Sequence, residues 1–216
     1  MDETLYEIDL VVGSMINVRP DEDREAYEEE HERVQDVQDL LREEGIEVDL
    51  VSQPGTEVWE GGITSFYDLY QLKQLAAHLE RGEDVQMLLS NSSPDGQEYD
   101  NLLADIVSEE ATTRFPHLIR HQGDGGFYLP ADFAEPIWVE SDDEEDLDAE
   151  DDETDLFDEG KVITFGSSVA LVRELSELED LFRRANVPMG GPRQALQALK
   201  TGAEQSVSTG LPLIVW

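Results

Sequence analysis

The sequence predicts an α+β protein in which helices pack on one face of a mixed, mostly antiparallel sheet. Short runs of alternating apolar and polar residues, typical of half-buried strands, recur along the chain. Helical runs lie between them without strict alternation, which favours two layers. Hydrophobic residues make up 39% of the 216 residues, which allows an ordinary packed core.

The first part of the chain predicts a strand, a charged helix and a second strand. Residues 5–12 and 46–51 alternate in polarity. Residues 21–44 place their apolar side chains on one helical face, acids crowd the first turn, and Gly45 suits the C-cap. Residues 53–62 are expected to form a loop, with Trp59 as an exposed candidate.

Seven further elements are expected, in chain order. They are a helix at 65–81 capped by Ser65, a strand at 85–89, a helix at 99–107, a strand at 161–165, helices at 168–182 and 192–210, and a strand at 213–216.

An acidic run divides the chain. Residues 140–159 contain 14 acids and no base, and this composition predicts a solvated loop or insert. The strand and helix that follow look like parts of the same core as the residues before the run. We therefore expect one α+β domain, made of residues 1–139 and 160–216.

The formal net charge of −38, from 52 acidic and 14 basic side chains, has two interpretations. One is an acidic partner surface, such as a nucleic-acid mimic or a binder of basic proteins. The other is adaptation of the whole surface to molar salt, where charges are screened within roughly 3 Å. Without residues 140–159 the balance is still −24 over 196 residues, so we favour salt adaptation and a halophilic protein.

Composition argues against several classes. No cluster of Lys and Arg is visible, so nucleic acid is not expected as a partner. The absence of cysteine excludes disulfides and thiolate zinc sites, and no cofactor is expected. The first four residues do not resemble a secretory signal, and no apolar run approaches the roughly 20 residues of a membrane helix. We therefore expect a cytoplasmic protein with no membrane partner.

Residues 114–133 concentrate the rare residue types: two of the four histidines, glycines that permit close approach, and isolated aspartates. Together with later residues, they supply the candidates for a binding site, which are His117, His121, Asp124, Tyr128, Asp132, Trp138 and Ser167.

A metal site at His117 and His121 depends on the backbone between them. On a strand the two would lie about 13 Å apart, too far for one zinc ion, whereas a helical turn from Pro116 would bring them together. Leu118 and Ile119, followed by glycines, favour a strand leading into a turn. We therefore prefer a hairpin whose histidines make structural hydrogen bonds, with a polar recognition surface as the other alternative and no metal.

Other signals are weaker. Ser167 precedes a helix, where it serves as a simple cap or as part of an anion site. Trp59 and Trp138 are contact anchors or core residues. No complete phosphate loop or Gly-x-Ser-x-Gly elbow occurs, and carboxylate pairs carry little information in so acidic a chain.

The region around the histidines resembles a family of small bacterial proteins. The similar residues are Phe115–Leu118, the His-x-x-x-Gly-Gly-x-Tyr-x-Pro pattern ending at Pro130, Asp132-Phe133, Pro136-Ile137, Gly166–Ser168 and Arg173–Leu175. That family is similar to immunity proteins of toxin systems, which bind a cognate toxin and have no catalysis of their own. The resemblance implies the same for this chain, in an acidic, haloarchaeal-like version with an insert at 140–159.

Two functions follow as hypotheses, with a third beside them. The first is a non-enzymatic, immunity-like binding protein with a protein partner. The alternative is a hydrolase, acting with or without a metal ion, that uses His117, His121 and Asp124. In the third, the acidic run itself recruits a basic partner.

Overall fold

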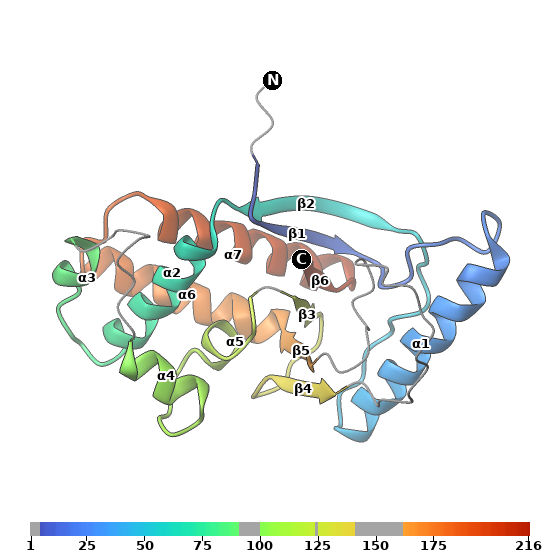
Figure 1. Ribbon diagram of the computed structural model, residues 1–216, viewed down its shortest axis with the longest axis horizontal. Helices are drawn as coiled ribbons and strands as arrows, with labels where there is room; N and C mark the ends of the chain where they lie inside the picture. Colours follow the sequence, from blue (N-terminus) through green and yellow to red (C-terminus); the bar gives the residue numbers. More distant parts are fainter. Residues whose placement is uncertain (1–4, 91–99, 124, 141–161) are drawn as a thin grey trace, which may run out of the picture.

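The computed structural model describes residues 5–90, 100–123, 125–140 and 162–216, and its described strands form one sheet (Figure 1). The strands are β1 (Ile8–Gly13), β2 (Glu57–Ile63), β3 (Gly126–Leu129), β4 (Ile137–Glu140), β5 (Val162–Ser167) and β6 (Leu213–Val215). The helices are α1 (Arg24–Glu43), α2 (Phe66–Leu79), α3 (Gln86–Ser90), α4 (Asn101–Val107), α5 (Pro116–Ile119), α6 (Ser168–Arg184) and α7 (Gly191–Thr209).

The sheet order is β2-β1-β6-β3-β5-β4. Every neighbouring pair is antiparallel except β3 and β5, which are parallel. Strands from before and after the acidic run are therefore direct neighbours: β4 pairs with β5, and β6 lies between β1 and β3. The predicted α+β fold with a mixed, mostly antiparallel sheet is confirmed.

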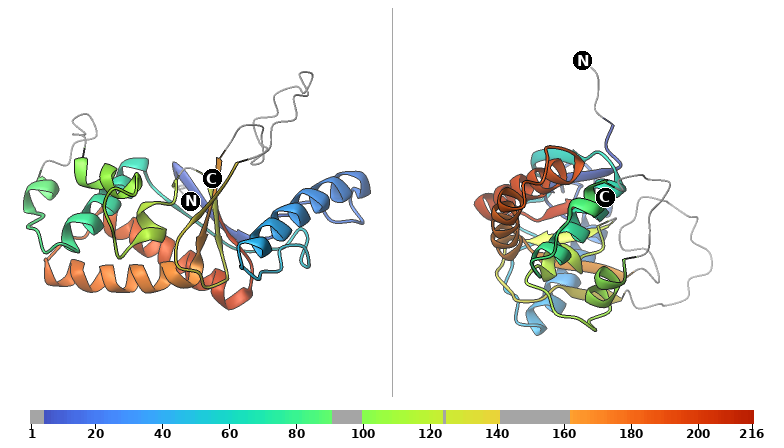
Figure 2. Two further views of the ribbon diagram at one scale, coloured as in Figure 1. Left: turned by 90° about the horizontal axis from the view of Figure 1, so that it is seen from below. Right: turned by 90° about the vertical axis from the view of Figure 1, so that its left-hand side faces the viewer.

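Helices α6 and α7 pack on one face of the sheet, and α2 packs against α7 (Figure 2). The three helices are together called the helical layer. Helix α6 contributes its predicted apolar stripe, and Leu171, Leu175, Leu178 and Phe182 are all fully buried. From the sheet, Leu10, Val12 and Leu213 meet this layer. Alternation along the strands thus places one set of side chains under the helices.

The opposite face of the sheet packs against a second cluster. Phe127, Phe165 and Ile214 point to this side, where they join Val34 and Leu41 of α1 and the segments on either side of that helix. Only the side of α1 that carries Val34, Gln38 and Leu41 is buried. The helix extends beyond the sheet, as Figure 1 and the left view of Figure 2 show.

Local signals explain most of the element boundaries. Ser65 Oγ accepts the Asp68 N–H at the start of α2, and Ser167 Oγ accepts the Ala170 N–H at the start of α6. Helix α7 begins with a proline in its first turn and ends at Gly210, whose φ of +74° is the left-handed conformation that glycine favours.

Three predicted elements in the first 90 residues were wrong. Residues 46–51 alternate in burial but join no strand; β2 follows instead, within the expected loop, and Trp59 packs on the helical-layer side. Residues 85–89 were expected as a strand, but Gln86–Ser90 is helical, with the Asp84 carboxylate accepting the Gln86 N–H. Short apolar runs suit either structure, so neighbouring chain segments decide between them.

The acidic run at 140–159 lies outside the described residues apart from its first, so the division into one domain and an insert stays a prediction. Within the described ranges, no helix combines the length and the apolar character needed to cross a bilayer.

Candidate functional site

The predicted site residues separate into buried and exposed groups. His117, His121, Tyr128 and Ser167 are buried, whereas Asp132 and Trp138 are exposed. Asp132 forms a two-bond ion pair with Arg173 of α6, at 2.8 and 2.6 Å. Trp138 lies on the edge strand β4 and is 39% exposed, and Asp124 falls outside the described residues.

His117 makes two hydrogen bonds to the backbone. Its Nδ1 accepts the Ser167 N–H at 3.0 Å, so Nε2 carries the proton and donates to the Phe133 carbonyl oxygen, also at 3.0 Å. Burial lowers the pKa of His117 to about 4, so the ring is neutral at pH 7. The ring connects α5 to β5 and to the loop after β3.

His121 stacks on the ring of Tyr128, with centroids 4.0 Å apart. Its Nε2 lies 3.3 Å from the Phe127 carbonyl oxygen, and burial lowers its pKa to about 3. The Tyr128 hydroxyl donates to the His117 carbonyl oxygen at 3.1 Å, and burial raises its pKa. His117, Tyr128 and Ser167 therefore converge, and His121 joins them through the Tyr128 ring, inside the core.

The expected strand at Leu118 and Ile119 was wrong: α5 is a helical turn that begins at Pro116. The reason is Glu174 of α6, whose carboxylate accepts the N–H groups of His117 and Leu118 at 3.1 and 2.9 Å. These N–H groups of a first turn would otherwise have no partner. Burial raises the pKa of Glu174 to about 8. This buried glutamate was missed, because nothing local distinguishes it among so many acids.

Gly126 serves internal packing. A Cβ at Gly126, where φ is +118°, would lie 2.6 Å from the Thr164 carbonyl oxygen. Among the described residues, no three His, Cys, Asp or Glu side chains gather closely enough to hold a metal ion. The predicted binding role of these residues stays a prediction; the contacts described here join α5, β3, β5 and α6.

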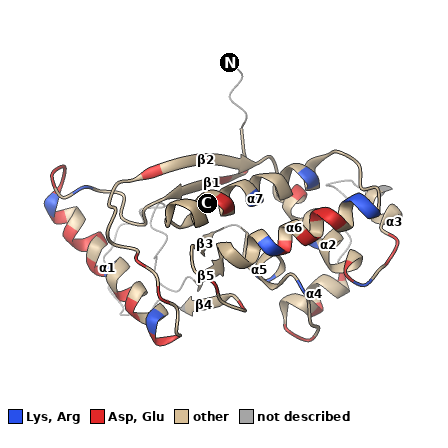
Figure 3. Cartoon of the chain, turned by 180° about the vertical axis from the view of Figure 1, so that it is seen from behind, with Lys and Arg blue, Asp and Glu red and all other residues tan. Residues whose placement is uncertain are grey.

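The distribution of charge identifies a different region. Residues 21–49, here called the α1 arm, contain fourteen acidic and three basic side chains. Residues 162–216, which include α6 and α7, contain five of each. Figure 3 shows acidic residues recurring along α1, whereas α6 carries both signs. The balance of −24 over 196 residues, from which salt adaptation of the whole surface was inferred, is therefore not shared by every part of the chain.

Helix α1 directs its acids away from the core. At 100° per residue, seven carboxylates lie within about 60° of the direction opposite the buried Val34. All seven are exposed, and this set, here called the carboxylate stripe, consists of Glu25, Glu28, Glu29, Glu32, Asp36, Asp39 and Glu43. The arginines of α1 flank the stripe: Arg24 pairs with Glu28 at 2.7 Å, and Arg42 pairs with Asp39.

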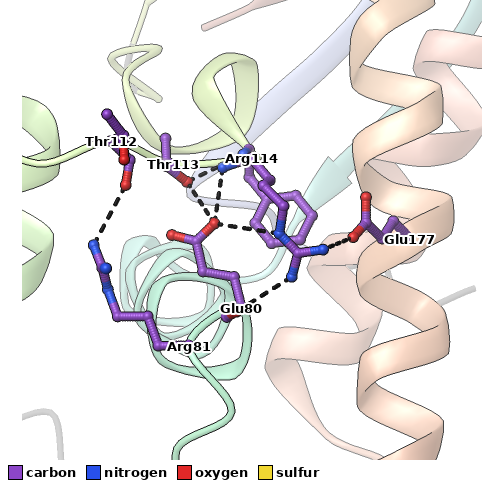
Figure 4. A network of polar contacts seen from close by, with 7 residues as sticks. Glu80, Arg81, Thr112, Thr113, Arg114 and Glu177 are labelled. Atoms are coloured by element: carbon purple, nitrogen blue, oxygen red, sulfur yellow. Dashed lines mark hydrogen bonds and ion pairs between the residues drawn. The ribbon is translucent and has the colours of Figure 1, made fainter.

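Around the helical layer, by contrast, Arg and Lys side chains connect one helix or loop to another. These contacts lie in the body, by which we mean the described residues outside the α1 arm. Arg114 pairs with Glu177 of α6 and donates to the Glu80 carbonyl oxygen, while the Glu80 carboxylate accepts the Arg114 N–H at 2.8 Å (Figure 4). Arg81 donates to the Thr112 carbonyl oxygen at 3.3 Å. Lys200 of α7 pairs with Glu179 of α6 at 2.8 Å.

The fold and the stripe define an acidic α+β protein with a near-neutral helical layer and a projecting helix of carboxylates. The chain belongs to the family described as "Putative DNA-mimic protein", which matches residues 6–215. No curated protein and no solved structure matches it.

The family corrects three expectations. The resemblance to immunity proteins was wrong, because the match to a different family covers nearly the whole chain. An immunity-like binder and a hydrolase using His117 and His121 are both set aside. The expected partners also change, since the family's description is of DNA mimicry, which corresponds to the acidic partner surface that the charge analysis weighed but did not favour. The expectation that nucleic acid itself is not a partner is not contradicted by it.

Proposed function

We propose that the protein is a DNA mimic that binds the DNA-binding surface of a partner protein through the carboxylate stripe of α1. The family's description supports mimicry, and the concentration of carboxylates on one outward face of α1 supports the location. The observation that carries the proposal is this asymmetry, with fourteen acids against three bases in the α1 arm and five of each in residues 162–216.

The spacing of the stripe suits this role. From Glu25 to Glu43 the helix rises about 27 Å, so its seven carboxylates follow one another at intervals of about 4.5 Å. One strand of duplex DNA presents a phosphate about every 3.4 Å along the axis. The stripe is therefore similar to one DNA strand in linear charge density.

The same geometry suggests the kind of partner. A single row of carboxylates offers acceptors for Lys and Arg but no groove and no base edges. The partner is therefore a protein that obtains most of its DNA affinity from phosphate contacts, in a basic cleft or along a basic ridge. The proposal retains the cytoplasmic location expected from the sequence.

A competition experiment tests the proposal. Proteins that bind DNA-cellulose are passed over the immobilised chain and then challenged with double-stranded DNA. Because the stripe would occupy the surface that DNA occupies, we expect DNA to release the captured partner.

Two variants of equal net charge make the experiment specific. The stripe variant neutralises five carboxylates of α1, as E25Q, E29Q, E32Q, D36N and E43Q. The body variant neutralises five exposed acids elsewhere, as E57Q, E60Q, D105N, E110Q and E204Q. We expect the body variant to retain the DNA-displaceable partner and the stripe variant to lose it. Equal retention by both variants would overturn the proposal.

A further inference from the structure

One carboxylate of α1 differs from the stripe in direction and in its contacts. Glu30 lies on the inner side of the helix, and its Oε2 accepts the N–H groups of Asn17 and Val18 at 2.7 and 3.2 Å. Both N–H groups belong to the segment that leads into the helix. Glu30 therefore fastens α1 to the chain entering it.

Gln38 makes the corresponding contact with the chain leaving the helix. Its Oε1 accepts the Leu50 N–H at 2.8 Å, and both residues are buried. The incoming and outgoing segments are also joined to each other near the sheet: the Gly55 N–H donates to the Ile16 carbonyl oxygen, and the Ser14 N–H to that of Thr56, both at 2.7 Å.

The two contacts are placed to stop two different movements of the helix. Eight residues separate Glu30 from Gln38, which is about 12 Å along the axis and about 80° around it. Val34 lies between them on the buried line. Apolar burial at Val34 and Leu41 is non-directional, so it resists small rolls and pivots of the helix only weakly. Hydrogen bonds on both sides of that line resist the roll, and their separation along the axis resists a pivot.

We infer that Glu30 and Gln38 are positioning residues that hold the carboxylate stripe outward, and that Glu30 is not itself a phosphate mimic. The consequence for partner binding rests on the proposed function, whereas the orientation of α1 does not. The two can therefore be measured separately.

Spin labels measure the orientation, and the chain offers a clean background because it contains no cysteine. A nitroxide pair at D36C and E204C, both exposed positions, reports the distance between α1 and α7. We expect a narrow distance distribution with Glu30 and with E30Q, whose amide oxygen still accepts both N–H groups. We expect a broad one with E30A. E32A, a neighbouring stripe residue, is the matched control and keeps the distribution narrow.

Helical circular dichroism of each variant shows that α1 is still formed, since alanine favours helix. A distribution in E30A as narrow as in the parent would overturn the inference, as would one in E30Q as broad as in E30A. Q38L provides a second variant, which removes the other contact at similar volume and is also expected to broaden the distribution.

Partner binding then separates the two kinds of carboxylate. We expect E30Q to bind the DNA-displaceable partner like the parent and E30A to bind on the order of threefold more weakly. At Glu32, glutamine and alanine should weaken binding equally, because only the charge matters there. If no DNA-displaceable partner exists, the proposed function fails, while the spin-label result still decides the positioning role.

Discussion

The α1 arm and the helical layer use charge in opposite ways. In the helical layer, α6 and α7 carry both signs, and pairs such as Lys200 with Glu179 join one helix to another. In the α1 arm the few arginines flank a row of carboxylates that faces away from the protein. The net charge of −38 therefore has to be counted for each structural element before it is interpreted.

The two regions also differ in what holds them. The helical layer is fixed by buried apolar side chains from three helices and the sheet. The arm buries one stripe of α1 and depends on side-chain contacts to its flanking segments. Changes in the layer should therefore alter stability, and changes on the outer face of the arm should alter binding.

The largest expected effect is Leu178→Ala in α6. Leu178 is fully buried, so the substitution should lower the free energy of unfolding by about 2–5 kcal/mol. Urea denaturation measures the loss. Partner binding by the folded fraction should not change, since the arm packs in the other cluster. Leu40→Ala, on the partly exposed side of α1, is the control and should cost less than about 1 kcal/mol.

Acid should destabilise the body through its buried histidines. Burial lowers the pKa of His117 to about 4 and of His121 to about 3, against about 6.5 in an unfolded chain. Below pH 6.5 the unfolded chain therefore binds more protons, and the free energy of unfolding falls as the pH drops. Near pH 4 each histidine contributes a loss of about 3 kcal/mol, since one unit of pKa shift corresponds to about 1.4 kcal/mol.

Glu174 opposes this trend. Its pKa, raised to about 8, means that the folded chain keeps a proton that the unfolded chain releases as the pH rises above 4.5. Its stabilising contribution is complete below pH 4.5 and is lost as the pH rises through 8.

Histidine NMR signals test the lowered pKa values of the two buried histidines: the signals of His117 and His121 should stay unchanged from pH 8 to pH 5. Titration of either near pH 6.5 would show that it is solvated.

Salt should act on the arm in two directions. Between 0.1 M and 1 M salt the screening length falls from about 10 Å to about 3 Å. Partner affinity should then fall by at least about tenfold, while the melting temperature of the free protein rises, because repulsion along the stripe is screened. Calorimetry and thermal melts measure the two effects, and an affinity insensitive to salt would argue for an apolar interface.

The smallest expected effects come from single charges. Glu32→Gln in the stripe should weaken partner binding by about threefold, the scale of one exposed ion pair. Glu204→Gln on α7 removes the same charge from an exposed site in the helical layer and should leave the dissociation constant unchanged. Equal losses in both variants would mean that total charge, rather than the arm, determines binding.

Much of the fold could be predicted from local patterns. The four-three-four spacing of Leu171, Leu175, Leu178 and Phe182 identified α6, and a proline and a glycine marked the ends of α7. Errors arose where a distant partner decides the structure. The Glu174 carboxylate stabilises residues 116–119 as a helix by accepting two of their N–H groups. The Gln38 side chain accepts the Leu50 N–H, which a neighbouring strand was expected to bind.

The site was harder to predict than the fold. Histidines and glycines in 114–133 attracted attention because they are rare, yet His117 and His121 hydrogen-bond to the backbone inside the core. The carboxylate stripe was visible in residues 21–44, but averaging over 196 residues hid it. Counting charge element by element would have found it, whereas the hydrogen bonds of Glu30 with the Asn17 and Val18 N–H groups require the structure.

Carboxyl footprinting of the complex tests the central claim most directly. Carbodiimide coupling of an amine to exposed carboxylates, read by mass spectrometry, is compared with and without the DNA-displaceable partner. We predict that Glu25, Glu29, Glu32 and Asp36 become protected in the complex, while Glu57 and Glu204 react as before. Protection confined to Glu57 and Glu204, or equal protection of both sets, would contradict the assignment of α1 as the surface that imitates DNA.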